Sequence, residues 1–246
     1  MFFVPRSIPK ILFPDKKPNI FKLYQIFGNF LFPYFCLSCN KFLKYGYLCE
    51  NCLKEIDFCL KIFCPKCKRR SPITENIYTI CCSNLIKSLI TFCNYEVEKI
   101  KLLIQLGKID GFYKIFEFLG YLIFEEIKNS KLNFKDYYIS YVSMYYLDEK
   151  RRGFNQAKIL AETLSKNIQL KIWDGLIKIK PTKLQTELGY KDRIENVKFA
   201  FKCKDIPPLN IILIDDVITT GATAFECAKT LREQGTKNII LITIAT

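Results

Sequence analysis

The chain has 246 residues, carries a formal net charge of +14 at pH 7, and contains twelve cysteines but no histidine. The length predicts one or two domains, and a hydrophobic content of 50% is ample for a packed core. The lack of histidine excludes histidine catalysis and mixed cysteine–histidine metal sites.

The positive charge is concentrated near the N-terminus. Residues 1–88 hold 14 Lys and Arg against 5 Asp and Glu, whereas residues 89–246 hold 24 against 19. A smaller and more basic N-terminal part predicts an anionic partner there, such as nucleic acid. We therefore predict two domains. Residues 1–88 form an N-terminal helix with a cysteine-rich module, and residues 89–246 form the main domain.

Apolar residues at helical spacing predict a helix over residues 19–31. This helix either packs on the cysteine-rich module or lies on a membrane surface. The longest uncharged run, residues 23–40, is interrupted by Gln25, Gly28 and Pro33, so we expect no stable membrane insertion. Because no secretory signal is apparent, we expect a cytoplasmic protein with reduced thiols.

Two short cysteine pairs follow this helix. Cys36 and Cys39 form the first C-x₂-C pair, and Cys49 and Cys52 form the second after nine intervening residues. This spacing can place four thiolates tetrahedrally around one Zn²⁺ ion. Four protein thiolates leave no open coordination position, so we predict structural rather than catalytic zinc.

A further pair, Cys64 and Cys67, is followed by the adjacent cysteines Cys81 and Cys82. Adjacent cysteines are poor partners in a tetrahedral site, so a second zinc site and a partial, non-binding site both stay open. The same stretch holds the most basic local cluster of the chain, Lys66, Lys68, Arg69 and Arg70. Lysines that alternate with aromatic residues suit single-stranded nucleic acid, while the aromatic residues suit the core of a small domain equally well.

The main domain shows alternating strand and helix patterns. The expected elements are strands over residues 89–95, 137–144, 211–214 and 238–244, and helices over residues 97–106, 112–128, 155–166 and 224–234. This order predicts a doubly wound parallel sheet whose ligand lies at the carboxyl ends of its strands. We also expect a polar, basic turn at residues 148–153, and residues 178–201 form either a solvated loop or a mobile lid.

The central feature of the main domain is the strand 211–214, which is apolar throughout and is followed at once by Asp215 and Asp216. A loop of small residues, Thr219 to Thr223, then leads into a helix N-terminus. Such an N-terminus offers backbone N–H groups and partial positive charge to a phosphate, and Gly221 allows the backbone to approach the anion. Threonine hydroxyls can add donors.

Carboxylates just before a phosphate loop suit ribose hydroxyls or a Mg²⁺ ion held near a second phosphate group. The implied ligand therefore has a phosphate, a sugar diol and a metal ion nearby. A buried strand that merely ends in two aspartates is the alternative interpretation. The chain has no G-x-x-x-x-G-K-[ST] pattern, which argues against a P-loop nucleotide hydrolase.

Residues 211–223 resemble the binding signature of the type I phosphoribosyltransferases, which take phosphoribosyl pyrophosphate. Other stretches resemble one branch of this superfamily, the ComF family of ComFC-like and GntX-like proteins. These stretches are Arg-Arg-Gly-Phe-Asn-Gln-Ala at 151–157, Thr-Lys-Leu-Gln-Thr at 182–186, Arg-Ile-Glu-Asn-Val-Lys-Phe-Ala-Phe at 193–201, and the two N-terminal cysteine pairs.

The resemblance implies an α/β fold, in which a type I phosphoribosyltransferase-like parallel sheet flanked by helices stands behind an N-terminal zinc-ribbon-like module. It implies that Asp215 and Asp216 are catalytic and meet the ribose hydroxyls and Mg²⁺. The residues that it implies for binding phosphoribosyl pyrophosphate are Val217, Thr219, Thr220, Gly221, Ala222, Thr223, Arg151, Arg152, Lys183 and Arg193. It further implies a role in natural transformation and in the handling of single-stranded DNA.

Three functions stay open at this point. The chain is a DNA-uptake protein that binds single-stranded DNA, a phosphoribosyltransferase of unknown acceptor without a DNA role, or a sensor that binds phosphoribosyl pyrophosphate without turnover. Whether the chain is an enzyme, which acceptor it uses and which oligomer it forms stay open as well.

Overall fold

The computed structural model describes residues 34–43, 46–73, 83–109, 112–182 and 190–246. The chain divides into two compact units, Met1–Cys49 and Glu50–Thr246. In the first unit, β1 (Tyr34–Phe35) and β2 (Phe42–Leu43) form an antiparallel hairpin. The second unit contains, in chain order, α2 (Glu50–Lys54), β3 (Lys61–Phe63), β4 (Arg70–Ser71), β5 (Ser88–Cys93), α3 (Glu98–Gly107), α4 (Lys114–Lys128), β6 (Tyr138–Tyr141), α5 (Tyr146–Arg152), α6 (Gln156–Ile168), β7 (Leu176–Lys178), α7 (Tyr190–Val197), β8 (Phe201–Cys203), β9 (Asn210–Val217), α8 (Ala222–Glu233) and β10 (Asn238–Ala245).

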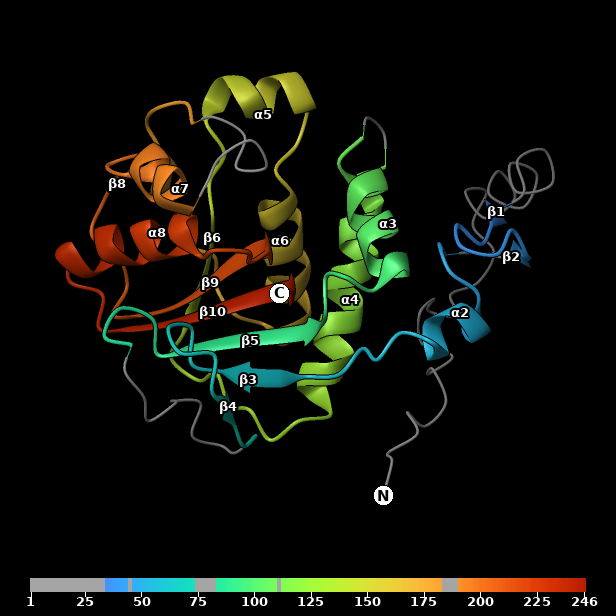
Figure 1. Ribbon diagram of the computed structural model, residues 1–246. Helices are drawn as coiled ribbons and strands as arrows, with labels where there is room; N and C mark the ends of the chain where they lie inside the picture. The colour runs from blue at the N-terminus through green and yellow to red at the C-terminus, as the bar shows by residue number, and fades with distance from the viewer. Residues whose placement is uncertain (1–33, 44–45, 74–82, 110–111, 183–189) are drawn as a thin grey trace, which may run out of the picture. The chain divides into compact units, whose positions relative to one another are not determined.

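The second unit is built on one sheet with the strand order β4-β3-β5-β10-β9-β6 (Figure 1). Strands β5, β10, β9 and β6 run parallel, and β3 and β4 add an antiparallel edge beyond β5. The predicted α/β class with a mostly parallel sheet flanked by helices is therefore confirmed. The predicted strand 211–214 lies within β9, which pairs with β10 on one side and β6 on the other.

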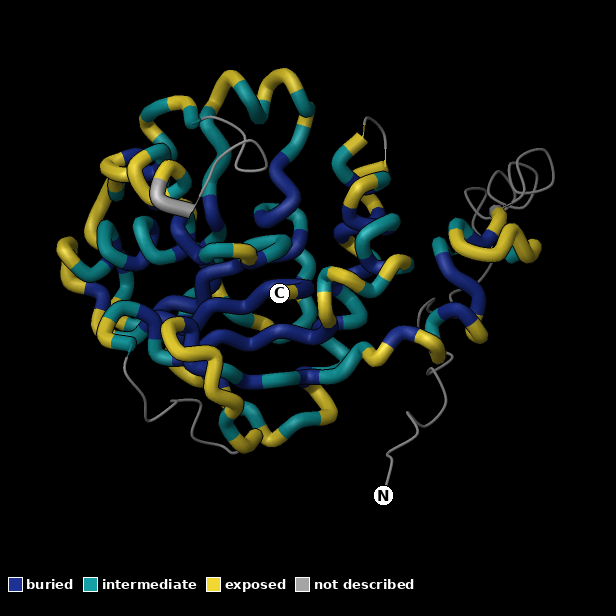
Figure 2. Tube along the Cα trace, in the orientation of Figure 1, coloured by how far each residue is buried: buried dark blue, intermediate teal, exposed yellow. Residues whose placement is uncertain are grey.

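Strand β9 is apolar on both sides because helices cover both faces of the sheet. Ile211 and Leu213 lie in a buried cluster with Cys227 of α8. Side chains alternate along a strand, so Ile212 and Ile214 point to the opposite face, where α4 and α6 pack against β10 and β9. Figure 2 shows the resulting buried layer along the central strands.

Strands β3 and β4 belong to the main sheet. β3 pairs with β5 from Lys61↔Thr91 to Phe63↔Leu89, and the N–H of Cys59 donates to the carbonyl of Phe92 at 2.8 Å. The compact units of the structure accordingly divide between residues 49 and 50. The domain boundary that the sequence analysis places at residue 88 stays a prediction.

A helix, α5, is found where the sequence predicts a turn at residues 148–153. Its first turn carries two acidic residues and its last turn carries three basic residues, so the side-chain charges complement the helix dipole. Gly153, with a φ of 84°, ends the helix in a left-handed C-cap. The prediction was wrong here because α5 buries none of its residues, so it lacks the apolar stripe that reveals a helix in a sequence.

The predicted loop or lid at residues 178–201 contains the helix α7. The flanking strands β7 and β8 pair antiparallel from Leu176↔Cys203 to Lys178↔Phe201. Residues 183–189 lie outside the described residues, so the lid interpretation stays a prediction. The helix expected at residues 19–31 also lies outside them. None of the helices in the described ranges combines the length and apolar character that a membrane crossing requires.

Candidate functional site

The acidic pair lies at the carboxyl end of the interior strand β9. Asp215 is in register with Thr243 of β10, and the pairing continues to Val217↔Ala245. Beyond the strand, the N–H of Ile218 donates to the carbonyl of Ala245 at 3.1 Å. Strand pairing thus fixes the backbone of the acidic pair. The half-buried side chains of the pair lie at the carboxyl ends of the parallel strands, where α/β folds of this kind bind ligands.

The predicted phosphate loop turns sharply into α8. Gly221 is the N-cap residue with a φ of 79°, a left-handed conformation that favours glycine. A Cβ atom at this position would lie 3.1 Å from the Phe225 ring and 3.3 Å from the Ile218 side chain. The N–H of Ala222 reaches Thr220 Oγ1 at 3.4 Å, and Thr219 is exposed. The loop can therefore present backbone amides and hydroxyls to an anion.

A lysine neutralises the second carboxylate of the pair. Lys108, the C-cap residue of α3, places its Nζ 2.8 Å from Asp216 Oδ2. Burial acts to raise the pKa of Asp216, but the charge and hydrogen bond of Lys108 outweigh it and leave that pKa below its usual value. For Lys108, burial acts to lower the pKa, and Asp216 reverses this effect, so the pKa of Lys108 is raised. Both groups are therefore charged at neutral pH.

The first carboxylate of the pair has the opposite character. Burial, together with the adjacent charge of Asp216, raises the pKa of Asp215 well above its usual value. Asp215 Oδ1 accepts from the N–H of Asp216 at 2.9 Å, and Asp216 Oδ1 accepts from the N–H of Val217 at 2.8 Å. One site thus holds two neighbouring carboxylates with pKa values shifted apart, an arrangement that can bind a divalent cation or a sugar diol.

A second lysine, Lys178 of β7, lies within electrostatic range of Asp215. Burial lowers its pKa, while the nearby carboxyl groups of Asp148 and Asp215 act in the opposite direction. Its Nζ donates to Thr182 Oγ1 at 2.6 Å. Sequence reasoning missed both Lys108 and Lys178. For Lys108 a usable signal was its position directly after Gly107, at the end of the helix that follows the first parallel strand.

The loop after β6, which the resemblance assigns to pyrophosphate, is fixed at both ends. Ser143 Oγ donates to the carbonyl of Leu176. Asn155 caps α6 by accepting from the N–H groups of Ala157 at 3.0 Å and Lys158 at 3.3 Å, and its Nδ2 donates to the carbonyl of Val142.

The predicted basic residues of this loop contact other residues of the same loop and helix. Arg151 is exposed and forms an ion pair with Asp148 at 3.2 Å, and Arg152 donates to Met144 Sδ at 3.9 Å. Within the described ranges, no hydrogen bond or ion pair joins either arginine to Asp215 or Asp216. Arg193 lies on α7, and Lys183 falls outside the described residues. The roles of these four residues in binding pyrophosphate stay predictions.

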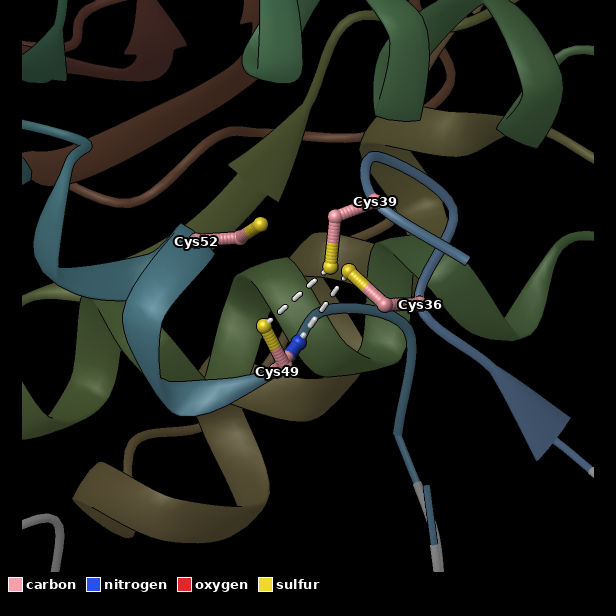
Figure 3. Close-up of side chains that lie close together, drawn as sticks. All are labelled: Cys36, Cys39, Cys49 and Cys52. Carbon is pink, nitrogen blue, oxygen red and sulfur yellow. Dashed lines mark hydrogen bonds between the residues drawn. The ribbon is translucent and has the colours of Figure 1, made fainter. Parts of the chain in front are cut away.

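The four cysteines predicted to bind zinc lie together. The sulfur atoms of Cys36, Cys39, Cys49 and Cys52 all lie within 4.8 Å of one another (Figure 3). Cys39 Sγ lies 3.6 Å from Cys49 Sγ, and the N–H of Cys49 donates to Cys36 Sγ at 3.3 Å. Tetrahedral zinc with Zn–S bonds of about 2.3 Å separates its sulfur atoms by about 3.8 Å, so this cluster can hold a metal ion such as Zn²⁺.

The backbone favours the thiolate form of the first cysteine. Burial acts to raise the pKa of the Cys36 thiol, but hydrogen bonds from the backbone of Cys49, Cys39 and Ser38 outweigh burial and lower the pKa to about 6. A thiol must lose its proton to bind zinc, so this environment suits a metal ligand. All the cysteines in the described ranges are free of disulfide bonds.

A second cysteine turn has the same backbone geometry as the first. In the first turn, the N–H of Cys36 donates to the carbonyl of Lys41, and the N–H of Asn40 donates to the carbonyl of Cys36, both at 2.8 Å. In the second, Cys64 pairs in the same way with Arg69 and Lys68, both at 2.9 Å. Asn40 and Lys68 occupy the same position in the two turns, and both have a left-handed backbone, with φ values of 57° and 60° respectively. Cys81 and Cys82, the other expected ligands, lie outside the described residues, so a second metal site stays a prediction.

Comparison with known proteins gives a consistent set of relatives, although no protein-family model matches the chain. Competence protein F from Haemophilus influenzae is 29% identical over 213 residues, 83% of this chain and 86% of that protein. DNA utilization protein YhgH from Escherichia coli (strain K12) is 27% identical over 218 residues, 82% of this chain and 92% of that protein. Competence protein ComFC from Bacillus subtilis is 37% identical over 87 residues, 35% of each chain.

Proposed function

Because the chain belongs to the ComF family of competence proteins, we propose that it is a ComFC-like DNA-uptake factor whose main domain binds phosphoribosyl pyrophosphate with Mg²⁺. The observation that best supports the ligand is the junction of β9 and α8. There, two carboxylates precede a left-handed glycine turn and the N-terminus of a twelve-residue helix. A sugar that carries both a diol and a phosphate matches this order of groups.

In this proposal, each part of the junction meets one part of the ligand. The 5′-phosphate sits on the loop from Thr219 to Thr223, with Gly221 giving the closest backbone approach. Asp215 and Asp216 hold the ribose diol or a Mg²⁺ ion beside it. Lys108 keeps Asp216 ionised, so the carboxylate is ready to accept these groups without first losing a proton.

If turnover occurs, the leaving pyrophosphate carries the electron pair of its bond to the ribose C1 carbon. The ribose then gains positive charge, which the carboxylates of Asp215 and Asp216 can stabilise. Cations must meet the pyrophosphate, and we assign this role to Arg151, Arg152, Lys183 and Arg193 together with Mg²⁺. A sensor would bind the same ligand through the same groups without this step.

We place structural zinc in the four-cysteine cluster and assign DNA contacts to the basic N-terminal part. We also propose a cytoplasmic location, where thiols stay reduced and can bind zinc. Lys66 and Arg69 are exposed on the turn between β3 and β4, and Arg70 is exposed at the start of β4. All three offer cations to a phosphate backbone. The names of the relatives, competence protein and DNA utilization protein, support a partner of this kind.

Thermal unfolding in the presence of ligands tests the sugar-phosphate site. We expect phosphoribosyl pyrophosphate with Mg²⁺ to raise the melting temperature, since a ligand at 100 times its Kd stabilises the folded state by about 2.7 kcal/mol. Ribose 5-phosphate should stabilise less, because it lacks the pyrophosphate. No shift with any of these ligands would contradict the proposal. Release of pyrophosphate that requires an added base or amine separates an enzyme from a sensor.

Fluorescence anisotropy with a labelled single-stranded oligonucleotide tests the DNA role. We expect affinity to fall steeply with salt, and to fall further when Lys66, Arg69 and Arg70 are changed to alanine. The matched control changes Lys114, Lys131 and Lys135 to alanine. Deleting residues 1–88 is a poor test, because it would remove strands β3 and β4 from the main sheet. Equal affinity of the two triple variants would favour a transferase or sensor without a DNA role.

A further inference from the structure

A cavity of ≈ 490 Å³ lies at the amino ends of two parallel strands, at the opposite end of β9 from the acidic pair. Tyr138 and Asn210, the first residues of β6 and β9, line it. The other lining residues are Asp136, Trp173, Ile206, Pro207, Pro208 and Leu209. The volume falls within the range of about 300–1,000 Å³ that is typical of small-molecule sites.

Hydrogen bonds join the segments that form this cavity. Asn210 Nδ2 donates to the carbonyl of Asp136 at 3.2 Å, which ties the start of β9 to the segment before β6. The N–H of Trp173 donates to the carbonyl of Ile139 at 2.8 Å, which ties the segment before β7 to β6. The walls are therefore preformed, and a ligand does not have to order them.

Trp173, the only tryptophan of the chain, is half-buried in this cavity. A Cβ atom at residue 175 would overlap its indole, so Gly175 gives the ring room to lie against the backbone. Among the described residues, no other aromatic ring, lysine or arginine stacks on this indole. The ring therefore keeps surface for a ligand, and tryptophan is the aromatic side chain that binds cations best.

The polar groups of the lining favour a ligand that donates hydrogen bonds and carries positive charge. Asp136 is the only charged lining residue, and it is exposed and forms no ion pair with the basic residues of the described ranges. Even its neighbour Lys135 is exposed and is not part of the lining. Pro207 and Pro208 have no N–H, so their wall offers backbone carbonyls without backbone donors.

We propose that this cavity binds a guanidinium group, carried by a small organic molecule or by an arginine side chain of a peptide. The planar cation stacks on the indole of Trp173, and its N–H groups donate to the carboxylate of Asp136. The apolar stem of the ligand covers Ile206 and Leu209, which are 88% and 56% exposed. The phosphate loop takes no part in this site, so the inference does not rest on the proposed function.

Titration of butylguanidinium into the full chain tests the site through the fluorescence of Trp173, since no other tryptophan contributes to the signal. Butylurea is the matched control ligand, because it has nearly the same shape without the charge. We expect a saturable change with butylguanidinium and at least tenfold weaker binding of butylurea. Butylammonium, which has the charge but no flat face, should bind with intermediate affinity.

The peptide acetyl-Gly-Arg-Gly-amide separates the two sources of the guanidinium group. If it competes with butylguanidinium at equal or higher affinity, the ligand is an arginine side chain. If butylguanidinium binds and the peptide does not compete, the ligand is a small molecule.

Two variants test the residues that hold the cation. Asp136→Asn keeps the shape of the side chain, and asparagine tolerates the left-handed backbone at this position, where φ is 67°. We expect about tenfold weaker binding of butylguanidinium to this variant, with butylurea unchanged. Trp173→Leu, measured by calorimetry because it lacks the fluorophore, should show a similar loss. Asp192→Asn, exposed on α7 and outside the cavity, is the control and should bind like the wild type.

Three results would overturn the inference. They are the absence of saturable binding of butylguanidinium to the wild type, equal affinities for butylguanidinium and butylurea, and equal affinities of Asp136→Asn and Asp192→Asn for butylguanidinium.

Discussion

The four-cysteine cluster and the acidic pair of β9 are two charged sites that are assembled in different ways. All four cysteines come from one short stretch of chain, residues 36–52, and no side chain of opposite charge is needed to bring their sulfur atoms together. The acidic pair instead depends on Lys108, which lies on α3, at a distance of about a hundred residues along the chain. One site is local in sequence, and the other is created by the packing of the sheet.

This difference has an energetic consequence. Four neighbouring thiolates, three of them buried, need a cation to neutralise them, so we expect the cysteine cluster to depend on a metal ion. The charge of Asp216 is already neutralised by Lys108 at 2.8 Å. The fold of the main domain should therefore tolerate removal of Mg²⁺, whereas the cysteine cluster should not tolerate removal of zinc.

The largest expected effect follows from breaking the cysteine cluster. Cys49→Ser removes one of its four ligands, and we expect loss of bound zinc together with loss of order around the cluster, since structural zinc contributes about 10–16 kcal/mol in small zinc domains. Elemental analysis and circular dichroism of the purified protein check this. Cys203→Ser, outside the cluster, is the control and should keep its zinc. A Cys49→Ser protein with unchanged zinc content would contradict the assignment.

The metal count also compares the two cysteine turns. If the turn at Cys64 and Cys67 binds metal as its backbone geometry allows, the wild type should contain two zinc ions per chain, and Cys64→Ser should contain one. A wild type with a single zinc ion that Cys64→Ser retains would show that the second turn keeps the geometry without the metal.

The next largest effect concerns the ion pair of the acidic site. Lys108→Met leaves Asp216 without its counter-charge, and we expect a loss of about 1–2 kcal/mol of stability in urea unfolding at neutral pH, since both groups are only partly exposed. The pKa of Asp216 is lowered in the folded state, so this contribution is present above its usual pKa and is lost as the pH falls through the folded value. The difference between variant and wild type should therefore shrink in acid. Lys128→Met is the surface control, and an equal effect there would contradict the account.

A smaller effect of opposite sign is expected at Asp215. Its pKa is raised in the folded state, so its contribution to stability is present below its usual pKa and is lost as the pH rises through the folded value. Asp215→Asn should therefore be more stable than the wild type at neutral pH, and the gain should disappear in acid. Thermal unfolding across the pH range measures this. If Asp215→Asn is instead less stable than the wild type at neutral pH, folding does not disfavour the ionised form of Asp215, which would contradict this account.

The difference between a site that is local in sequence and a site assembled by packing also explains what could be predicted from the sequence. The C-x₂-C spacing predicted the four members of the cysteine cluster, and the apolar run before Asp215 predicted a buried strand near the centre of the sheet, where β9 pairs with β10 and β6. Lys178 carries no local pattern that connects it with the acidic pair, and the signal for Lys108 is limited to its position directly after Gly107, because the proximity of both lysines to the pair results from the packing of the fold. Helix α5 was missed for a related reason, since a helix without buried residues has no apolar periodicity.

The turn at Gly221 shows where local sequence and long-range packing agree. Its left-handed backbone could be expected from glycine before a helix, but the close approach of Phe225 and Ile218 could not. A cavity of ≈ 470 Å³ beside Thr219 was invisible in the sequence, because its lining comes from four separate parts of the chain, at residues 63–68, 89–96, 218–219 and 246.

Calorimetric titration of phosphoribosyl pyrophosphate in the presence of Mg²⁺ tests the central claim most directly. The comparison is between the wild type and the double variant Asp215→Asn/Asp216→Asn, with Asp174→Asn as an acidic control away from the loop. We predict saturable binding by the wild type and the control, and at least tenfold weaker binding by the double variant. Equal affinity in all three proteins, or no binding to the wild type, would contradict the assignment of the β9–α8 junction to a phosphorylated sugar.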